Sequence, residues 1–229
     1  MSDRRLPPSV SDGTSGVARF GRAAVLGTIR AAVALTGGHR THEGPVPQGP
    51  TVVAFHHTSP VDAFMIGMPI WKAGGHPIAM VKASVFRNPI SGPIVRSTGM
   101  IPVARKMAES RQLAYDASLV HLEKGHVVHI APHGTITPVA EVGEWRAGAA
   151  RLAQEAGVPL VPAVVFGPER WGGVPGENLH FAARVDVHVC FGEPIEVGPD
   201  DDVAAVTEQA RQVVAAFVDR HHDADSTTD

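Results

Sequence analysis

The stretch TVVAFHHTSPVD, residues 51–62, holds the clearest structural signal in the chain. It opens with an apolar run of the length of a buried strand and then passes through two histidines. The Ser-Pro-Val-Asp that follows at 59–62 is typical of a helix start, with a capping side chain, an early proline and an acid in the first turn. The pattern predicts a buried strand over 51–56, a sharp turn, and a helix over 60–72.

The rest of the chain alternates short apolar runs with helical stretches, which indicates one α/β domain with a mostly parallel central sheet flanked by helices. Further strands are predicted at 77–82, 100–105, 127–132, 160–167 and 184–191, and further helices at 107–124, 146–156 and 200–222. A chain of 229 residues suits one such domain, placed here at 51–221. The Gly-, Pro- and His-rich segment 37–50 is interpreted as a linker.

The two ends of the chain, 1–15 and 222–229, lack apolar periodicity and are predicted to be disordered. Residues 16–36 are predicted to form an N-terminal amphipathic helix, with Val17, Phe20, Ala24, Ala31 and Leu35 on one side and Arg19, Arg22 and Arg30 on the other. Such a helix can lie in a lipid headgroup layer, although it can also pack on its own domain. Arg30 interrupts the apolar stretch, so the chain is not expected to cross a bilayer.

Composition excludes several classes of protein. Hydrophobic residues make up 44% and charged residues 19% of the chain, which is ordinary for a globular protein and excludes a wholly disordered one. The formal net charge of -3 gives no overall positive field, so no nucleic-acid partner is expected. The single cysteine, Cys190, can form neither an internal disulfide nor a zinc site made of cysteines, and its apolar neighbours favour a core position.

His57 and Asp62 are the first candidates for chemistry. A carboxylate five residues after a histidine, across a strand-to-helix turn, can hold the imidazole, fix its tautomer and raise its basicity. The second ring nitrogen then faces a substrate at the carboxyl edge of the sheet, where parallel α/β sheets bind ligands. Helix capping alone would explain Ser59, Pro60 and Asp62. It does not explain the pair of histidines at the strand end.

Three later segments complete a pattern of four blocks. They are GMIPVAR at 99–105, IAPHGT at 130–135 and GVPLVP at 157–162. With His57, Ser59 and Asp62 they resemble, in order and spacing, the blocks of the glycerolipid acyltransferase superfamily, of the lysophosphatidate acyltransferase type. The resemblance covers about 51–167, and VKASVF at 81–86 and WRAGAAR at 145–151 also fit it. A lone His-x4-Asp is weak evidence, but four blocks in order are a strong signal.

The resemblance implies that His57 is the general base, that Asp62 orients it, and that Ser59 and Arg105 contact the substrate. Position 56 holds histidine where the family has asparagine. The third block departs further, because the family's Glu-Gly-Thr-Arg is His-Gly-Thr-Ile at 133–136. In the family that glutamate helps to hold the acceptor and two arginines bind its phosphate. Only Arg105 remains here for an anion, which puts a glycerol phosphate acceptor in question.

The prediction is an O-acyltransferase that moves a fatty acyl group from acyl-CoA or acyl carrier protein to the hydroxyl of a lysophospholipid or related lipid. His133, Gly134 and Thr135 are assigned to substrate binding, and the N–H groups around Gly134 and Thr135 are candidate oxyanion donors. The commoner role of such a glycine is a simple turn. No metal or redox cofactor is expected. The protein is expected to bind peripherally at the cytoplasmic face of the cell membrane.

Two other interpretations are open. A metal-dependent hydrolase could use His56, His57, Asp62, His129 and His133, which all lie at predicted strand ends and have zinc-binding side chains. His129 and His133 are four apart on a strand that leads into a turn, so their side chains need not converge. The altered third block could instead indicate a catalytically inactive relative that binds lipid, although His57 and Asp62 are both retained.

Overall fold

The fold is described by a computed structural model for residues 27, 38–89, 91–104, 106–171 and 185–226. Three predictions therefore lie outside the described residues. They are the role of Arg105, the disordered tail at 1–15, and the amphipathic helix over 16–36, of which only Gly27 is described.

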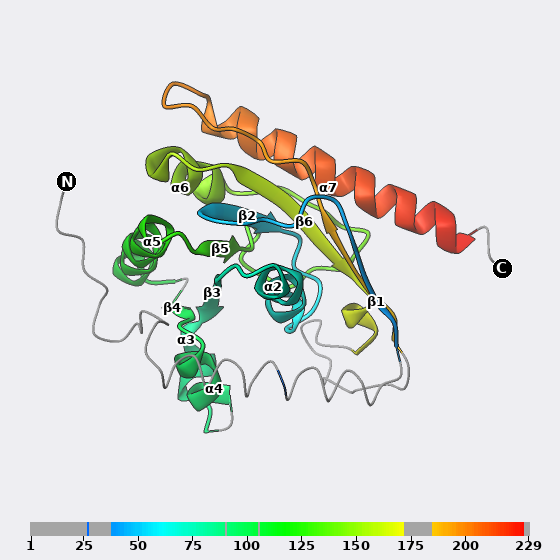
Figure 1. Cartoon of the computed structure of the whole chain (residues 1–229), viewed down its shortest axis with the longest axis horizontal. Helices are drawn as coiled ribbons and strands as arrows, with labels where there is room; N and C mark the ends of the chain where they lie inside the picture. Colours follow the sequence, from blue (N-terminus) through cyan, green and yellow to red (C-terminus); the bar gives the residue numbers. More distant parts are fainter. Residues whose placement is uncertain (1–26, 28–37, 90, 105, 172–184, 227–229) are drawn as a thin grey trace.

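Seven strands form one sheet in the order β1-β7-β6-β2-β5-β3-β4 (Figure 1). The strands are β1 (Arg40–Glu43), β2 (Thr51–Phe55), β3 (Pro77–Lys82), β4 (Ile101–Val103), β5 (Val127–Ile130), β6 (Leu160–Phe166) and β7 (Val187–Phe191). Neighbouring strands run parallel, except that β6 and β7 are antiparallel. The predicted single α/β domain with a mostly parallel sheet is confirmed.

Helices cover both faces of the sheet (Figure 1). They are α2 (Asp62–Lys72), α3 (Ala83–Arg87), α4 (Ser91–Ser97), α5 (Ala108–Glu123), α6 (Gly148–Ala156) and α7 (Val203–Ser226), with a 3-10 turn at Pro168–Trp171. The apolar side of α2 packs on one face, while α5, α6 and α7 pack on the other. Burial of apolar surface on both faces explains why the central strands are apolar throughout.

β2 lies at the centre of the sheet, and all five of its residues are buried. Successive side chains alternate between the faces, so Phe55 packs with α2 while Ala54 packs with α6. Pairing continues one residue past the strand, because the N–H of His56 donates to the carbonyl of Ala163 at 3.0 Å. The same alternation directs His57 towards the side of α2, where Asp62 lies.

The structure differs from the sequence prediction in four places. The segment interpreted as a linker contains β1, whose four polar residues lack the apolar alternation of a half-buried strand. The first predicted helix begins at Asp62, after a turn over 59–61 that contains the proline. The Pro/Gly-rich stretch between β3 and β4 contains α3 and α4. The last helix continues to Ser226, past the predicted start of the tail at 222.

Candidate active site

Asp62 organises the turn between β2 and α2. Its side chain is fully buried, and its Oδ2 atom accepts hydrogen bonds from the N–H groups of Thr58 at 2.7 Å and Ser59 at 2.8 Å. The N–H of Asp62 in turn donates to the carbonyl of Ser59 at 3.2 Å. These backbone hydrogen bonds hold the carboxylate in place without help from another side chain. Its position therefore does not depend on a substrate.

His57 is held against this carboxylate. Its Nδ1 lies 3.1 Å from Oδ2 of Asp62, and its ring contacts Phe55 edge-on with the centroids 5.5 Å apart. The carbonyl of His57 accepts from the N–H of Thr137 at 2.9 Å, which fixes the backbone as well. The predicted proximity of His57 and Asp62 is confirmed. A proton on Nδ1 facing the carboxylate leaves Nε2 as the basic nitrogen.

A cleft of about 400 Å³ opens beside His57. Most of its lining is apolar: Phe55, Pro60, Ala63, Met80, Val81, Val85, Ala131 and Ile136 join His57, Lys82 and Thr135. Only 15% of the His57 side chain is exposed, so the imidazole is sheltered but reachable. This volume and lining suit part of an apolar chain next to a few polar groups. Lys82 is the one cation in the described lining.

The segment after β5 contributes one wall of the cleft. Gly134 has φ 72°, which favours glycine, and its N–H donates to the carbonyl of Ala131 at 3.0 Å. Thr135 and Ile136 then line the cleft. The turn therefore places Thr135 beside the reacting region, while the N–H of Gly134 is engaged within the turn itself.

His133 and His56, the two histidines at positions where the family pattern has other residues, lie together behind the cleft. Their ring centroids are 5.6 Å apart, and Nε2 of His56 lies 3.1 Å from the carbonyl of Val139. Burial lowers the pKa of both imidazoles, and repulsion between them adds to the lowering at His56. Both rings are therefore neutral at neutral pH, and neither replaces the charge of the family's glutamate.

The other predicted site residues have different surroundings. Ser59 is fully buried and does not belong to the cleft lining, so its observed contribution is the backbone N–H that Asp62 accepts. His129 is enclosed in the centre of β5, 1% exposed, and burial lowers its pKa to about 4. Lys82 and Val85 line the cleft, which the sequence did not predict, although both fall in the segment 81–86 that fits the family.

The ligand set suggested for a metal-dependent hydrolase is not assembled. Among the described residues, one group of three His, Cys, Asp or Glu side chains brings its ligand atoms together, and it consists of Glu43, His188 and Cys190. None of these belongs to the set around His57. The hydrolase interpretation therefore has no geometric support in the described part of the chain.

Comparison with known proteins connects this geometry to a family. The Acyltransferase family matches residues 38–166, more than half of the 229 residues. The chain belongs to the Acyltransferase family. It is thus an O-acyltransferase of the glycerolipid acyltransferase superfamily, as the four blocks predict.

Relatives of known activity agree with this membership. The chain is 28% identical to a 1-acyl-sn-glycerol-3-phosphate acyltransferase of Bacillus subtilis (strain 168) over 167 residues, covering 70% of this chain and 77% of that one. It is 28% identical over 140 residues to the chloroplastic 1-acyl-sn-glycerol-3-phosphate acyltransferase LPAT1 of Arabidopsis thaliana, covering 60% of this chain and 37% of that one. The chain thus spans about a third of the plant relative's length.

A solved structure shares the fold. The crystal structure of the 1-acyl-sn-glycerophosphate acyltransferase PlsC from Thermotoga maritima superposes with a TM-score of 0.68 at 16% sequence identity, covering 90% of this chain and 81% of that one. At this identity the likeness concerns the arrangement of the sheet and helices. It extends the family's architecture over nearly the whole chain.

Proposed function

We propose that this acyltransferase moves a fatty acyl group from acyl-CoA or acyl carrier protein to the hydroxyl of a lysophosphatidate-like lipid. The observation that carries the proposal is the His57–Asp62 pair, which stands at the wall of an apolar cleft with one ring nitrogen bound and the other available. The names of the relatives support a lipid acceptor of this class.

His57 supplies the base for the reaction. Its Nε2 takes the proton of the acceptor hydroxyl while the oxygen attacks the thioester carbonyl carbon, and Asp62 stabilises the imidazolium that forms. When the tetrahedral intermediate collapses, the carbon–sulfur bond breaks and the leaving thiolate takes the proton from the imidazolium. The products are an ester and a free thiol, and the pair returns to its starting state.

The developing oxyanion needs a hydrogen-bond donor close to the carbonyl oxygen. Of the two candidate backbone groups, the N–H of Gly134 already donates within its turn, which favours Thr135 at the cleft wall. We assign Thr135 to this role. His133 is placed to support the turn from behind, through its contact with His56.

The acceptor headgroup meets a weakly charged surface. Ile136 occupies the cleft wall at the position where the family's third block has arginine, and Lys82 is the one cation in the described lining. Arg105 is proposed as a second anion-binding group. Lys82 can bind a phosphate, and the apolar Ile136 favours an acceptor whose headgroup is less charged than that of lysophosphatidate.

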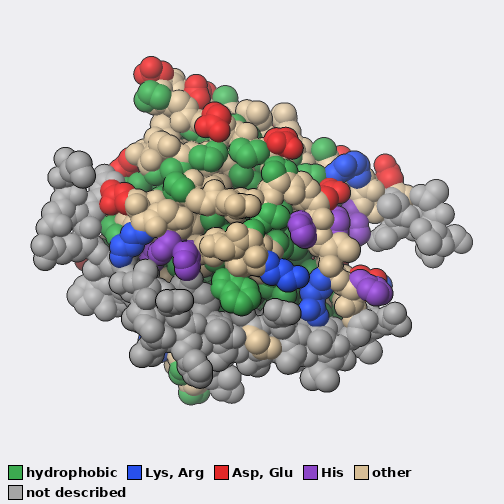
Figure 2. Space-filling model, in the orientation of Figure 1, with side chains coloured by type: hydrophobic (Ala, Val, Ile, Leu, Met, Phe, Trp, Pro, Cys, Tyr) green, Lys and Arg blue, Asp and Glu red, His purple; other side chains and the backbone are tan. Residues whose placement is uncertain are grey.

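We place the enzyme peripherally on the cytoplasmic face of the cell membrane. No described helix is long and apolar enough to cross a bilayer. Acidic side chains gather along the α7 side of the molecule (Figure 2), where Asp200, Asp201, Asp202 and Glu208 are exposed. Repulsion from anionic lipid would turn this side away from the membrane.

The decisive experiment measures free thiol released from acyl-CoA by the wild-type chain and by His57→Ala, with a panel of lysolipid acceptors. Loss of general-base catalysis should lower turnover by about 10²–10⁴-fold. His222→Ala, an exposed histidine on α7, is the matched control and should keep full turnover. Near-full turnover in His57→Ala would refute the assignment. Lipid binding without thiol release by the wild type would instead identify an inactive relative.

A further inference from the structure

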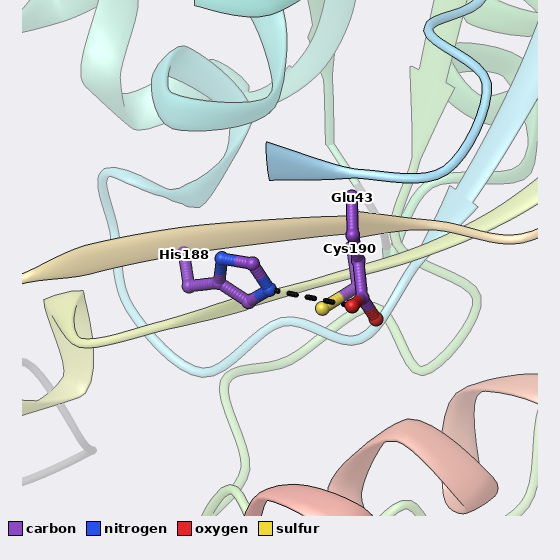
Figure 3. Close-up of side chains that lie close together, drawn as sticks. All are labelled: Glu43, His188 and Cys190. Carbon is purple, nitrogen blue, oxygen red and sulfur yellow. Dashed lines mark ion pairs between the residues drawn. The ribbon is translucent and has the colours of Figure 1, made fainter. Parts of the chain in front are cut away.

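A second group of reactive side chains lies at one end of the strand order, on the edge strand β1 and its neighbour β7 (Figure 3). His188 and Cys190 are two residues apart in β7 and share one face, and Glu43 of β1 is the register partner of Cys190. One ligand atom from each side chain lies within 4.8 Å of the others. Nε2 of His188 is 3.7 Å from Oε2 of Glu43.

Neighbouring groups orient these side chains. The hydroxyl of Thr41 lies 2.6 Å from Nδ1 of His188, which fixes the ring and leaves Nε2 directed at Glu43. The guanidinium of Arg220 on α7 donates to Oε1 of Glu43 at 2.8 Å, which leaves Oε2 on the inner side. Such contacts to the second nitrogen of a histidine and the second oxygen of a carboxylate are typical of the groups that surround a metal.

We propose that Glu43, His188 and Cys190 form a three-ligand site for a divalent transition metal, with zinc as the best match and water as a fourth ligand. A thiolate, an imidazole and a carboxylate are the ligands that zinc prefers. Atoms bound to one tetrahedral zinc lie roughly 3.3–3.7 Å apart, given bonds of about 2.0–2.3 Å. The 3.7 Å between Nε2 of His188 and Oε2 of Glu43 is close to this range, and the three ligand atoms, which lie within 4.8 Å of one another, would draw together around the ion. The partial exposure of the His188 and Glu43 side chains gives an ion access.

The thiol of Cys190 carries the proton that a metal ion would replace. The thiol of Cys190 is hydrogen-bonded to the neighbouring carboxylate of Glu43. A zinc ion would take the place of the shared proton, forming a zinc–sulfur bond as one proton leaves to solvent. The thiolate and carboxylate together balance the two positive charges of the ion.

The site would act on stability and leave the chemistry at His57 unaffected. In the strand order β6 lies between β7 and β2, the strand that leads to His57, and none of the three ligands belongs to the cleft lining. Gly44, with φ 79°, follows Glu43, and a Cβ there would collide with the carbonyl oxygen of Phe191, so β1 is packed closely on β7. A shared ion would hold the short edge strand to β7.

The test titrates zinc into the full chain, prepared without a histidine tag and freed of metal by a chelator. Calorimetry in two buffers of different ionisation enthalpy should give one ion per chain and release of about one proton. Cobalt(II) should produce a thiolate-to-metal charge-transfer band, which can only come from Cys190 because the chain has one cysteine. No saturable binding by the wild type would overturn the proposal.

Variants locate the ion. Cys190→Ser and His188→Gln should each lower zinc affinity by more than about 100-fold, and Cys190→Ser should abolish the cobalt band. His42→Gln is the matched control, because His42 precedes Glu43 in β1 but lines a separate cavity of about 110 Å³ against α2. Equal zinc affinity in Cys190→Ser would place the ion elsewhere and refute the site. Should a variant fail to fold, the wild type decides: absence of the cobalt charge-transfer band would refute the site, because Cys190 is the one cysteine of the chain.

Discussion

Two histidine–carboxylate pairs in this fold differ in how they are built. His57 and Asp62 are five residues apart in the chain. Nδ1 of His57 lies 3.1 Å from Oδ2 of Asp62, and the Asp62 carboxylate is fully buried. His188 and Glu43 come from distant parts of the chain, lie 3.7 Å apart, and are 33% and 42% exposed. Backbone N–H groups hold the carboxylate of the first pair, whereas side chains, Thr41 and Arg220, orient the second. The first geometry suits proton transfer and the second suits an ion.

The largest effect expected from this comparison concerns the charge of Asp62. In Asp62→Asn the amide oxygen can still accept from Thr58 and Ser59, so the turn should persist. The negative charge that stabilises the imidazolium of His57 is lost, and turnover should fall by about 10²–10⁴-fold. Thiol release at saturating substrates measures this change, with circular dichroism as the check on folding.

Glu43→Gln is the matched substitution in the second pair, and it should leave turnover unchanged. Asp62→Asn within tenfold of the wild type would contradict a role for the buried charge in the chemistry. An equal loss of turnover in Glu43→Gln would mean that the two pairs do not act separately.

His129 shows what burial does to an imidazole whose pKa no carboxylate among the described residues raises. Its pKa is lowered to about 4 by burial, so between pH 6.5 and 4 the unfolded chain binds a proton that the folded chain does not. The free energy of unfolding should therefore fall as pH drops through this range, by about 3 kcal/mol from this group. Urea unfolding at a series of pH values measures the slope.

His129→Leu should flatten that slope, because the group that charges on unfolding is gone. His56 and His133, whose pKa values burial also lowers, should keep part of the acid sensitivity. His222→Gln, at an exposed position, should retain the wild-type slope. An unchanged slope in His129→Leu would show that His129 does not cause the loss of stability at low pH.

The same contrast explains what the sequence could predict. His57 and Asp62 are close in the chain, and a strand-to-turn pattern suffices to bring them together. β1 has no apolar alternation, so nothing in the sequence places Glu43 beside Cys190. His133 falls in the third block, but the turn at Gly134 directs it behind the cleft, and only side-chain packing reveals this.

Thr41→Val tests what orients the imidazole in the His188–Glu43 pair. Removing the hydroxyl deletes the contact to Nδ1 of His188 and frees the ring to rotate, while the three proposed ligands stay in place. Zinc affinity should drop by about 10–100-fold, the usual effect of removing a group that orients a metal ligand. Competition with a chromophoric chelator measures it. Wild-type affinity in this variant would mean that Thr41 does not orient the ring.

Ile136→Arg touches neither pair and so separates acceptor binding from proton transfer. Ile136 lines the cleft next to Thr135, and the described lining contains no acidic side chain. A guanidinium there restores the cation of the family's third block and can bind a phosphate, so KM for lysophosphatidate should fall by about tenfold. Turnover should change little, because the His57–Asp62 contact is untouched. Ile136→Met, which keeps the wall apolar, is the control and should leave KM unchanged. A lower KM for acceptors without phosphate as well would show that the arginine acts on the lipid chain or the donor, and the assignment of this wall to the acceptor headgroup would fail.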